Sequence, residues 1–245
     1  IGALHFAETG RYDGFTATSI AALAMEPAIA WVGPLPEIML YNDQARSHTG
    51  INVMRQYYTT DLDGSGIIVA VADSGLDDDH GDFGTRIIDS VDLVGDGSTA
   101  DQHSGHGTHV ACTVLGDGSH TSSYAGIAPE AELYFQAMEN DNSGNFQWAS
   151  INNMLNTAYN QGARVHTNSW GSSSSSEWGA YTSSAEDVDD RARYYDQYYS
   201  GREGLVILFA NGNDGPDSGT VGPPATAKNT ISVGNSQNRY SGAPN

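Results

Sequence analysis

Five short runs of apolar residues stand out along the chain, and each has the length of a buried β-strand. Helical patterns of apolar residues alternate with them, in residues 110–115, 148–159 and 183–199. Strands separated by helices predict an α/β fold with a mostly parallel sheet that helices cover on both faces. The five predicted strands are residues 67–72, 133–136, 164–168, 205–209 and 230–233.

The first 41 residues follow a different pattern. A short apolar segment, residues 19–25, is followed by a strand-like run, residues 28–32. Pro34 and Pro36 then favour an extended path toward Tyr41. A polar run begins at Asn42, and we therefore predict two domains, residues 1–41 and residues 42–245.

The composition is strongly acidic, with a formal net charge of −20 and Lys228 as the single lysine. Such a surface repels nucleic acids and anionic membranes, so we expect neither as a partner. No apolar run approaches the ~20 residues that a membrane-spanning helix needs. Cys112 is the only cysteine, which excludes a disulfide within the chain and predicts a small buried apolar side chain.

Polar residues whose side chains can take part in catalysis follow the predicted strands. Asp73 comes directly after the first strand, and Asn211 and Asn213 follow the fourth. His106 lies between two glycines, just before a predicted helix. A histidine can take and give a proton near neutral pH, and ligands of parallel sheets bind at the carboxyl ends of the strands. These residues are therefore candidates for an acid–base site with an amide donor.

Other interpretations of the same residues stay open at this point. His103, His106 and His109 are spaced three apart, which raises a metal site, although the glycines beside His106 disfavour one regular helix through all three. Asp73, two residues before Gly75, is also a common type of turn residue, and an Asn-Gly pair is a common turn.

Five segments taken together resemble the subtilisin-like serine proteases, in order and in spacing, over about residues 42–235. The sequence Thr-Asn-Ser-Trp-Gly at 167–171 and the sequence Asn-Asp-x-Ala-Arg that starts at Asn42 look closest to the oxidatively stable alkaline protease branch. The matching segments are Val-Ala-Asp-Ser-Gly at 71–75, His-Gly-Thr-His-Val-Ala at 106–111, Gly-Ile-Ala-Pro at 126–129, Asn-Ser-Trp-Gly at 168–171 and Ala-Asn-Gly-Asn-Asp-Gly at 210–215.

The resemblance implies a subtilisin-like three-layer fold and a role for each matching residue. Asp73 would orient His106, which would act as the general base, and Asn213 would donate to the oxyanion. Removing such a donor, in a measurement made on subtilisin itself, costs roughly 10²–10³ in kcat. Residues 139–144 would pair with the other side of the substrate. The implied substrate-binding residues are Ser169, Trp170, Gly171, Ala210, Asn211 and Gly212, with Phe146 in the S4 pocket.

The resemblance also implies a nucleophilic serine in a Gly-Thr-Ser-x-Ala segment that opens a late helix. The 245 residues contain no such segment, and Ser236 and Ser241 lack its motif. We therefore expect the C-terminal part of the fold to be missing, and the serine to lie on a further segment or chain. This chain alone is then predicted to be inactive. The alternative is a non-catalytic module that uses the same fold for binding or assembly.

Residues 1–41 resemble the tail of a subtilase propeptide. We expect a cut between Tyr41 and Asn42, with Tyr41 in the P1 pocket and Ile38 in S4. The resemblance further implies a secreted enzyme that acts on polypeptides and needs no cofactor for catalysis. It also makes the acidic turns at residues 61–64 and 77–79 candidates for a structural calcium ion, with solvated turns that bind no ion as the alternative.

Overall fold

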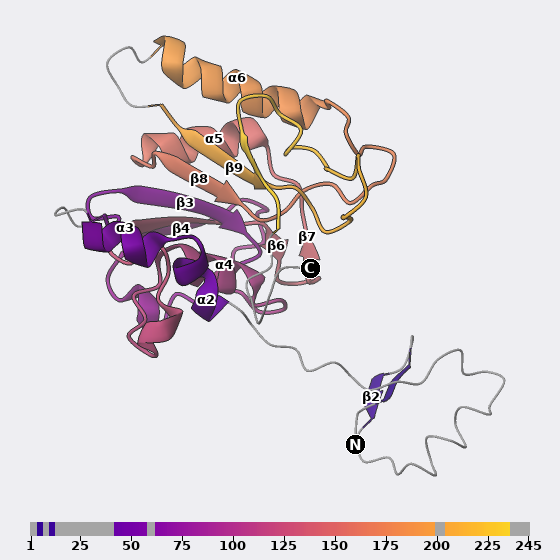
Figure 1. Cartoon of the computed structure of the whole chain (residues 1–245). Coiled ribbons are helices and arrows are strands. Elements are labelled where there is room, and N and C mark those ends of the chain that lie inside the picture. Colours follow the sequence, from indigo (N-terminus) through magenta and orange to yellow (C-terminus); the bar gives the residue numbers. More distant parts are fainter. Residues whose placement is uncertain (1–3, 7–9, 13–41, 58–61, 199–203, 236–245) are drawn as a thin grey trace. The chain divides into compact units, whose positions relative to one another are not determined.

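The computed structural model describes residues 4–6, 10–12, 42–57, 62–198 and 204–235 (Figure 1). The chain divides into two units, Ile1–Leu40 and Tyr41–Asn245. In the first unit, β1 (Leu4–Phe6) and β2 (Gly10–Tyr12) form an antiparallel hairpin. The predicted features of residues 19–41 lie outside the described residues, so the propeptide-like assignment stays a prediction.

Six parallel strands form the sheet of the second unit, in the order β10-β9-β8-β3-β5-β4. All five predicted strands are confirmed, with ends that differ by at most one residue. The sixth, β4, was not predicted, because it lies at the sheet edge and mixes apolar with polar residues, all of them exposed or only partly buried. The strands are β3 (Ile68–Asp73), β4 (Ile87–Asp92), β5 (Glu132–Ala137), β8 (Val165–Asn168), β9 (Val206–Ala210) and β10 (Ile231–Val233).

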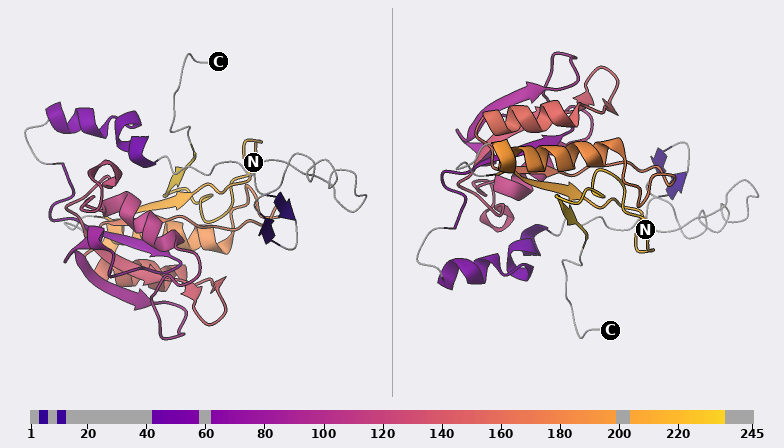
Figure 2. Two further views of the ribbon diagram at one scale, coloured as in Figure 1. Left: turned by 90° about the horizontal axis from the view of Figure 1, so that it is seen from below. Right: turned by 90° about the horizontal axis from the view of Figure 1, so that it is seen from above.

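Helices cover both faces of this sheet, as predicted (Figures 1 and 2). Helix α4 (His106–Leu115) packs on one face, and α5 (Ile151–Asn160) and α6 (Ser183–Tyr198) pack on the other. Side chains of β3 alternate between the two faces, since successive residues of a strand point in opposite directions. Val69 and Val71 join the core under α4, and Ala70 and Ala72 join the cores under the other helices.

Two short helices precede the sheet, where the sequence predicted only a polar boundary. They are α2 (Asn42–His48) and α3 (Ile51–Tyr57). Arg46 donates to the carbonyl of Ser122, and Arg55 donates to the carbonyl of Ile127 over 2.6 Å. These hydrogen bonds join the two helices to the loop that follows α4.

The first part of the predicted helix 148–159 is wrong. Helix α5 begins at Ile151, where the side chain of Ser150 accepts the backbone N–H of Asn153 and so caps the helix. Trp148 lies before this cap and is exposed. The remaining short elements are the 3-10 helices η1 (Gly81–Phe83) and η2 (Ser122–Tyr124), and the hairpin of β6 (Glu139–Asn140) with β7 (Asn145–Phe146). In the described part of the chain, no helix has the length and apolar character to cross a bilayer.

Candidate active site

Asp73 owes its position to the alternation of strand β3. It is the last residue of the strand, and its side chain points to the same face of the sheet as those of Val69 and Val71, the face that α4 covers. Its side chain is only 1% exposed. The strand therefore places a buried carboxylate at the carboxyl edge of the sheet, directly beside the start of α4.

His106 is the first residue of α4 and meets that carboxylate. Its Nδ1 lies 2.5 Å from Oδ1 of Asp73. The same oxygen accepts the backbone N–H of Ser74. The imidazole is 53% exposed, and its Nε2 makes no hydrogen bond to any residue that the structure describes. One ring nitrogen is thus held by a buried acceptor, and the other is accessible.

A close backbone contact allows this meeting. A Cβ on Gly107 would lie 2.3 Å from the carbonyl oxygen of Gly75. Only glycine fits between the start of α4 and the turn after β3, so the glycine after His106 is required by packing. The preceding Gly105 has a φ of 67°, in the left-handed region that favours glycine.

The surrounding charges raise the pKa of His106 above its ordinary value. The main cause is the hydrogen bond to Asp73, and the negative charges of Asp73 and Asp101 act in the same direction, against the opposing effect of burial. The carboxylates favour the imidazolium form. The arrangement therefore suits a group that must accept a proton and hold it briefly.

The cleft beside His106 brings together the other candidates. It has a volume of about 610 Å³, and Asn213 lies in its wall, exposed. Strands β8 and β9 pair in parallel, so the segments that follow them come to the same edge of the sheet. Every predicted substrate-binding residue lines this cleft: Phe146, Ser169, Trp170, Gly171, Ala210, Asn211 and Gly212.

Aromatic side chains form one wall of the cleft. Trp170 donates its Nε1–H to the carbonyl of Ala72 over 2.9 Å. Its ring meets Phe209 and Trp148 edge to face, with centroids 5.2 Å and 5.3 Å apart, and Phe146 lies 5.9 Å away. The contact of Trp148 with Trp170 was missed, because the spacing of Trp148 fits a helical pattern; Ser150, a typical N-cap residue, was the signal that the helix begins later.

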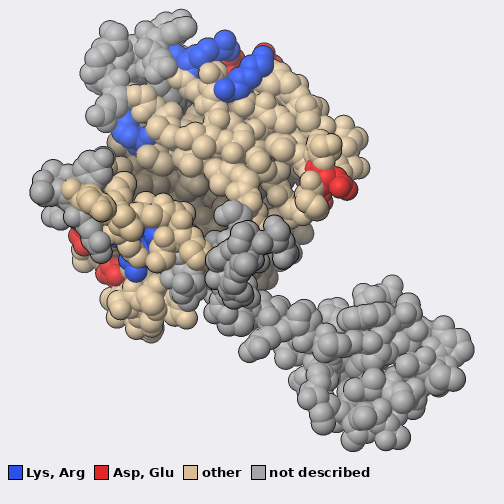
Figure 3. Space-filling view, viewed as in Figure 1, with Lys and Arg blue, Asp and Glu red and all other residues tan. Residues whose placement is uncertain are grey.

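The cleft carries little charge although the chain is strongly acidic. His106 and Asp214 are its only titratable lining residues among those that the structure describes. On the face drawn in Figure 3, acidic and basic side chains lie toward the margins, and the middle of the face is uncharged. The lining therefore favours neutral, extended ligands over strongly charged ones.

The predicted segment 139–144 folds back on itself. Glu139 pairs with Phe146 across the β6–β7 hairpin, and Gly144 has a φ of 68° at its turn. Tyr41, Ser236 and Ser241 lie outside the described residues, and Asn42 is the first residue of α2. The structure thus describes the cleft residues, whereas the predicted cleavage site and the roles of Ser236 and Ser241 stay predictions.

The three histidines do not gather around a metal ion. His103 contacts the backbone carbonyl of Asp141 through Nε2 over 2.8 Å, and His109 is exposed on α4. Among the described residues, no group of three or more His, Cys, Asp or Glu could hold a metal. Asp61 lies outside them and Asp77–79 are exposed, so calcium stays a prediction, and no step is assigned to it.

Cys112 is half-buried, where full burial was expected. It packs at the border of the core under α4, and its Sγ lies 3.8 Å from Nδ1 of His80. Burial, with nearby Asp82 and Asp77, raises the pKa of the thiol to about 12. The thiol therefore stays protonated at neutral pH and is a poor nucleophile.

Comparison with known sequences assigns this architecture to a family. The sequence model of the Subtilase family matches residues 64–244, which is most of the chain. The chain belongs to the subtilase family. The match contains Asp73, His106 and Asn213, so the resemblance inferred from the five segments is confirmed at the level of the family.

Individual subtilases give the extent of the similarity. Thermitase of Thermoactinomyces vulgaris is 29% identical over 171 residues, which are 70% of this chain and 55% of thermitase. A subtilisin of Bacillus sp. (strain TA39) is 29% identical over 228 residues, 87% of this chain and 50% of that protein. The chain thus spans about half the length of these relatives.

Solved structures support the fold. A psychrophilic subtilisin-like protease from the Antarctic psychrotroph Pseudoalteromonas sp. AS-11 superposes with a TM-score of 0.57 at 23% identity. The superposition covers 77% of this chain and 39% of that protease. The parallel sheet with its two helical layers is therefore shared with a known subtilisin-like protease.

Proposed function

We propose that this chain carries the Asp–His part of a serine endopeptidase, which hydrolyses peptide bonds through an acyl-enzyme. One observation carries the proposal: Nδ1 of His106 lies 2.5 Å from the buried Oδ1 of Asp73, at the mouth of a cleft that Asn213 also lines. A carboxylate, an imidazole and an amide donor in one cleft are the protein groups, apart from the nucleophile, that acyl transfer requires.

The proposed mechanism follows from the two ring nitrogens of His106. Asp73 holds the hydrogen on Nδ1, which leaves the lone pair of Nε2 as the base. Nε2 would take the proton of a serine hydroxyl while the serine oxygen bonds to the substrate carbonyl carbon. The imidazolium would then give this proton to the leaving amine as the peptide C–N bond breaks. Water would cleave the acyl-enzyme by the same proton transfers.

Asn213 would stabilise the oxyanion of the tetrahedral intermediate by donating its side-chain N–H. A donor aimed at the developing charge is a large source of catalysis in such enzymes. The backbone of Ser169, Trp170 and Gly171 would pair with an extended substrate. The aromatic wall formed by Phe146 and Trp170 favours large apolar side chains in the substrate.

We further propose that the nucleophilic serine is contributed by a segment or chain outside these 245 residues, which alone would be inactive. The sequence offers no Gly-Thr-Ser-x-Ala motif, whereas Asp73, His106 and Asn213 are all present, and a pure binding module has no physical need for that set. The Asn-Ser-Trp-Gly segment ending at Gly171 supports placement in the oxidatively stable alkaline protease branch. The competing function is a pseudoprotease.

Maturation is proposed to cut between Tyr41 and Asn42, with residues 1–41 acting as a propeptide-like tail. The boundary between the two structural units, Leu40 to Tyr41, supports this position because it falls one residue away. Secretion is proposed as well. One relative, 33% identical over 187 residues, is named Minor extracellular protease Vpr of Bacillus subtilis.

A fluorophosphonate probe tests the proposal on the purified full-length protein, which here means the native protein with any segment that the proposal places outside these 245 residues. The probe labels only an activated serine, so we expect covalent labelling of the wild type and its loss in His106→Ala. His120→Ala is the matched control, because His120 is exposed and lies outside the cleft. Peptide mapping would locate the labelled serine, and N-terminal sequencing of the labelled protein should read Asn-Asp-Gln-Ala-Arg.

Three results would correct different parts of the proposal. A folded wild type that never reacts with the probe would favour the pseudoprotease. A label on Ser236 or Ser241 would move the nucleophile into this chain. An N-terminus other than Asn42 would reject the cleavage site while leaving the catalytic assignment intact.

A further inference from the structure

A second carboxylate lies beside the candidate dyad and binds the start of helix α4. Oδ1 of Asp101 accepts the backbone N–H of Gly105 over 3.0 Å. Its Oδ2 accepts both the backbone N–H and the hydroxyl of Thr108, over 2.9 Å and 2.8 Å. Because Gly105 offers no side chain to cap the helix, Asp101 supplies the capping acceptor from outside it.

The same carboxylate also holds the turn that follows Asp73. The hydroxyl of Ser74 donates to Oδ1 of Asp101 over 2.9 Å and accepts the backbone N–H of Gly107 over 2.9 Å. A hydrogen bond of 3.0 Å joins the hydroxyls of Ser104 and Ser74. One side chain thus connects the residue after Asp73 with the residues on both sides of His106.

Backbone packing keeps Asp101 in this place. The N–H of Leu76 donates to the carbonyl of Thr99 over 2.8 Å. A Cβ on Gly75 would lie 2.1 Å from the carbonyl oxygen of Ala100. The segment that carries Asp101 is therefore pressed directly against the turn after β3.

We propose that Asp101 is a positioning residue of this site, which holds the turn after Asp73 and the start of α4 together so that His106 meets Asp73. The proposal rests on the proposed function and deepens it. Asp101 is not among the residues that line the cleft; it acts through Ser74, Gly105 and Thr108. Its fixed charge adds a second effect, because Asp73 and Asp101 are the two charged groups that act on His106.

That charge provides a readout that a purely structural role would not move. The negative charge of Asp101 contributes to the raised pKa of His106, after the larger contribution of the hydrogen bond to Asp73. Replacing Asp101 by asparagine keeps the shape and removes the charge. The pKa of His106 must then fall, and the acid limb of kcat/KM must move to lower pH.

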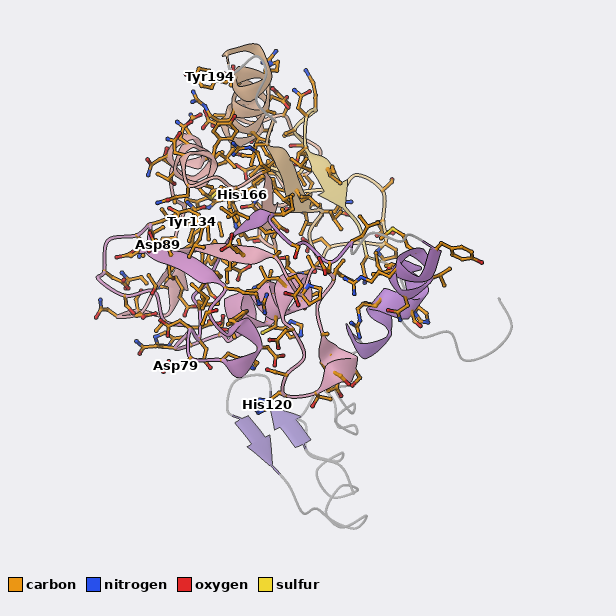
Figure 4. The ribbon with its side chains drawn as sticks, turned by 90° about the vertical axis from the view of Figure 1, so that its left-hand side faces the viewer. Asp79, Asp89, His120, Tyr134, His166 and Tyr194 are labelled. Carbon is orange, nitrogen blue, oxygen red and sulfur yellow. The ribbon has the colours of Figure 1, made fainter. Side chains whose placement is uncertain are left out.

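The experiment compares wild type, Asp101→Asn and Asp79→Asn in the full-length protein. Asp79 is the matched control: its replacement removes the same charge from an exposed turn (Figure 4), where its side chain makes no hydrogen bond with the described residues. Peptide hydrolysis gives kcat, KM and their pH profiles, and NMR titration gives the pKa of His106 without any need for activity.

We expect kcat of Asp101→Asn to fall about tenfold with little change in KM, less than the roughly 10²-fold that a displacement of about 1 Å can cost. The pKa of His106 should fall in the same variant. Asp79→Asn should keep the wild-type kcat. A kcat and a His106 pKa that match those of Asp79→Asn would overturn the proposal.

A second variant covers a failure of Asp101→Asn to fold, which a thermal melt would reveal. Thr108→Val keeps the charge of Asp101 and removes one donor to it. We expect a several-fold loss of kcat with an unchanged pKa of His106, and an unchanged kcat would overturn the positioning role. If the wild type proves inactive, the proposed function fails, and the NMR titration of Asp101→Asn still decides whether Asp101 acts on His106.

Discussion

Among the residues that the structure describes, one buried histidine should make the stability of the protein depend on pH. His166 of β8 is fully buried between the sheet and the helices (Figure 4). Its Nε2 lies 2.9 Å from Oε1 of Gln136, and its Nδ1 lies 3.1 Å from Nδ2 of Asn168. The amide of Gln136 in turn donates to Thr157 of α5. These contacts suit a neutral imidazole that donates from Nε2 and accepts at Nδ1.

Burial lowers the pKa of His166 from 6.5 to about 3. Between these two values the unfolded chain binds a proton that the folded chain does not, so the free energy of unfolding decreases as the pH falls. At about 1.4 kcal/mol per pH unit, the full effect is about 5 kcal/mol. From pH 7 to pH 5 it amounts to about 2 kcal/mol.

The perturbation is His166→Gln, which keeps a side-chain N–H for Gln136 and removes the titrating group. We expect the variant to lose about 1 kcal/mol at pH 7, because the acceptor for Asn168 is gone. It should also lose about 2 kcal/mol less than the wild type between pH 7 and pH 5. Equilibrium urea unfolding of the full-length protein, followed by tryptophan fluorescence, measures both differences.

The control is His120→Gln, which removes an exposed histidine. It should keep the pH dependence of the wild type. The reasoning is refuted if His166→Gln and the wild type lose the same free energy of unfolding between pH 7 and pH 5, because His166 would then not be held neutral by burial.

Two further predictions concern the candidate site. Because Asp73 raises the pKa of His106, kcat/KM of the full-length enzyme should reach half its maximum on the acid side above about pH 6.5; a midpoint below that value would contradict the assigned base. Gly107→Ala places a methyl group 2.3 Å from the carbonyl of Gly75 and should cost at least about 1–3 kcal/mol of stability. The thermal midpoint measures this, and Gly81→Ala, whose Cβ meets nothing closer than 3.7 Å, should leave it nearly unchanged.

The central strands were predictable because burial on both faces leaves a local signal. A strand such as β3 is apolar at nearly every position, so its sequence alone marks it. The edge strand β4 has no such signal, since Ile88 and Asp89 are exposed within it and its other residues are only partly buried. Helices α2 and α3 were missed for a related reason: the polar run from Asn42 fits a linker as well as an exposed helix.

The dyad was predictable because its residues lie inside short motifs. Asp73 ends a buried strand and His106 opens a glycine-flanked helix, and both features are local. The capping role of Asp101 has no local signal, since it depends on Ser74, 27 residues earlier, and on Thr108, seven residues later. The same holds for the contact of Trp148 with Trp170, a residue of the cleft wall, because the two tryptophans belong to different segments of the chain.

The sequence by itself determined five of the six strands of the main sheet, the family and the chemical identity of the site residues, because apolar runs and motif spacing are properties of consecutive residues. The tertiary structure decided what those residues do to one another. It buries Asp73 against His106, places Asp101 in hydrogen bonds with the start of α4, and buries His166 in a hydrogen-bonded core. Burial and long-range contacts set these properties, and neither can be seen in the order of residues along the chain.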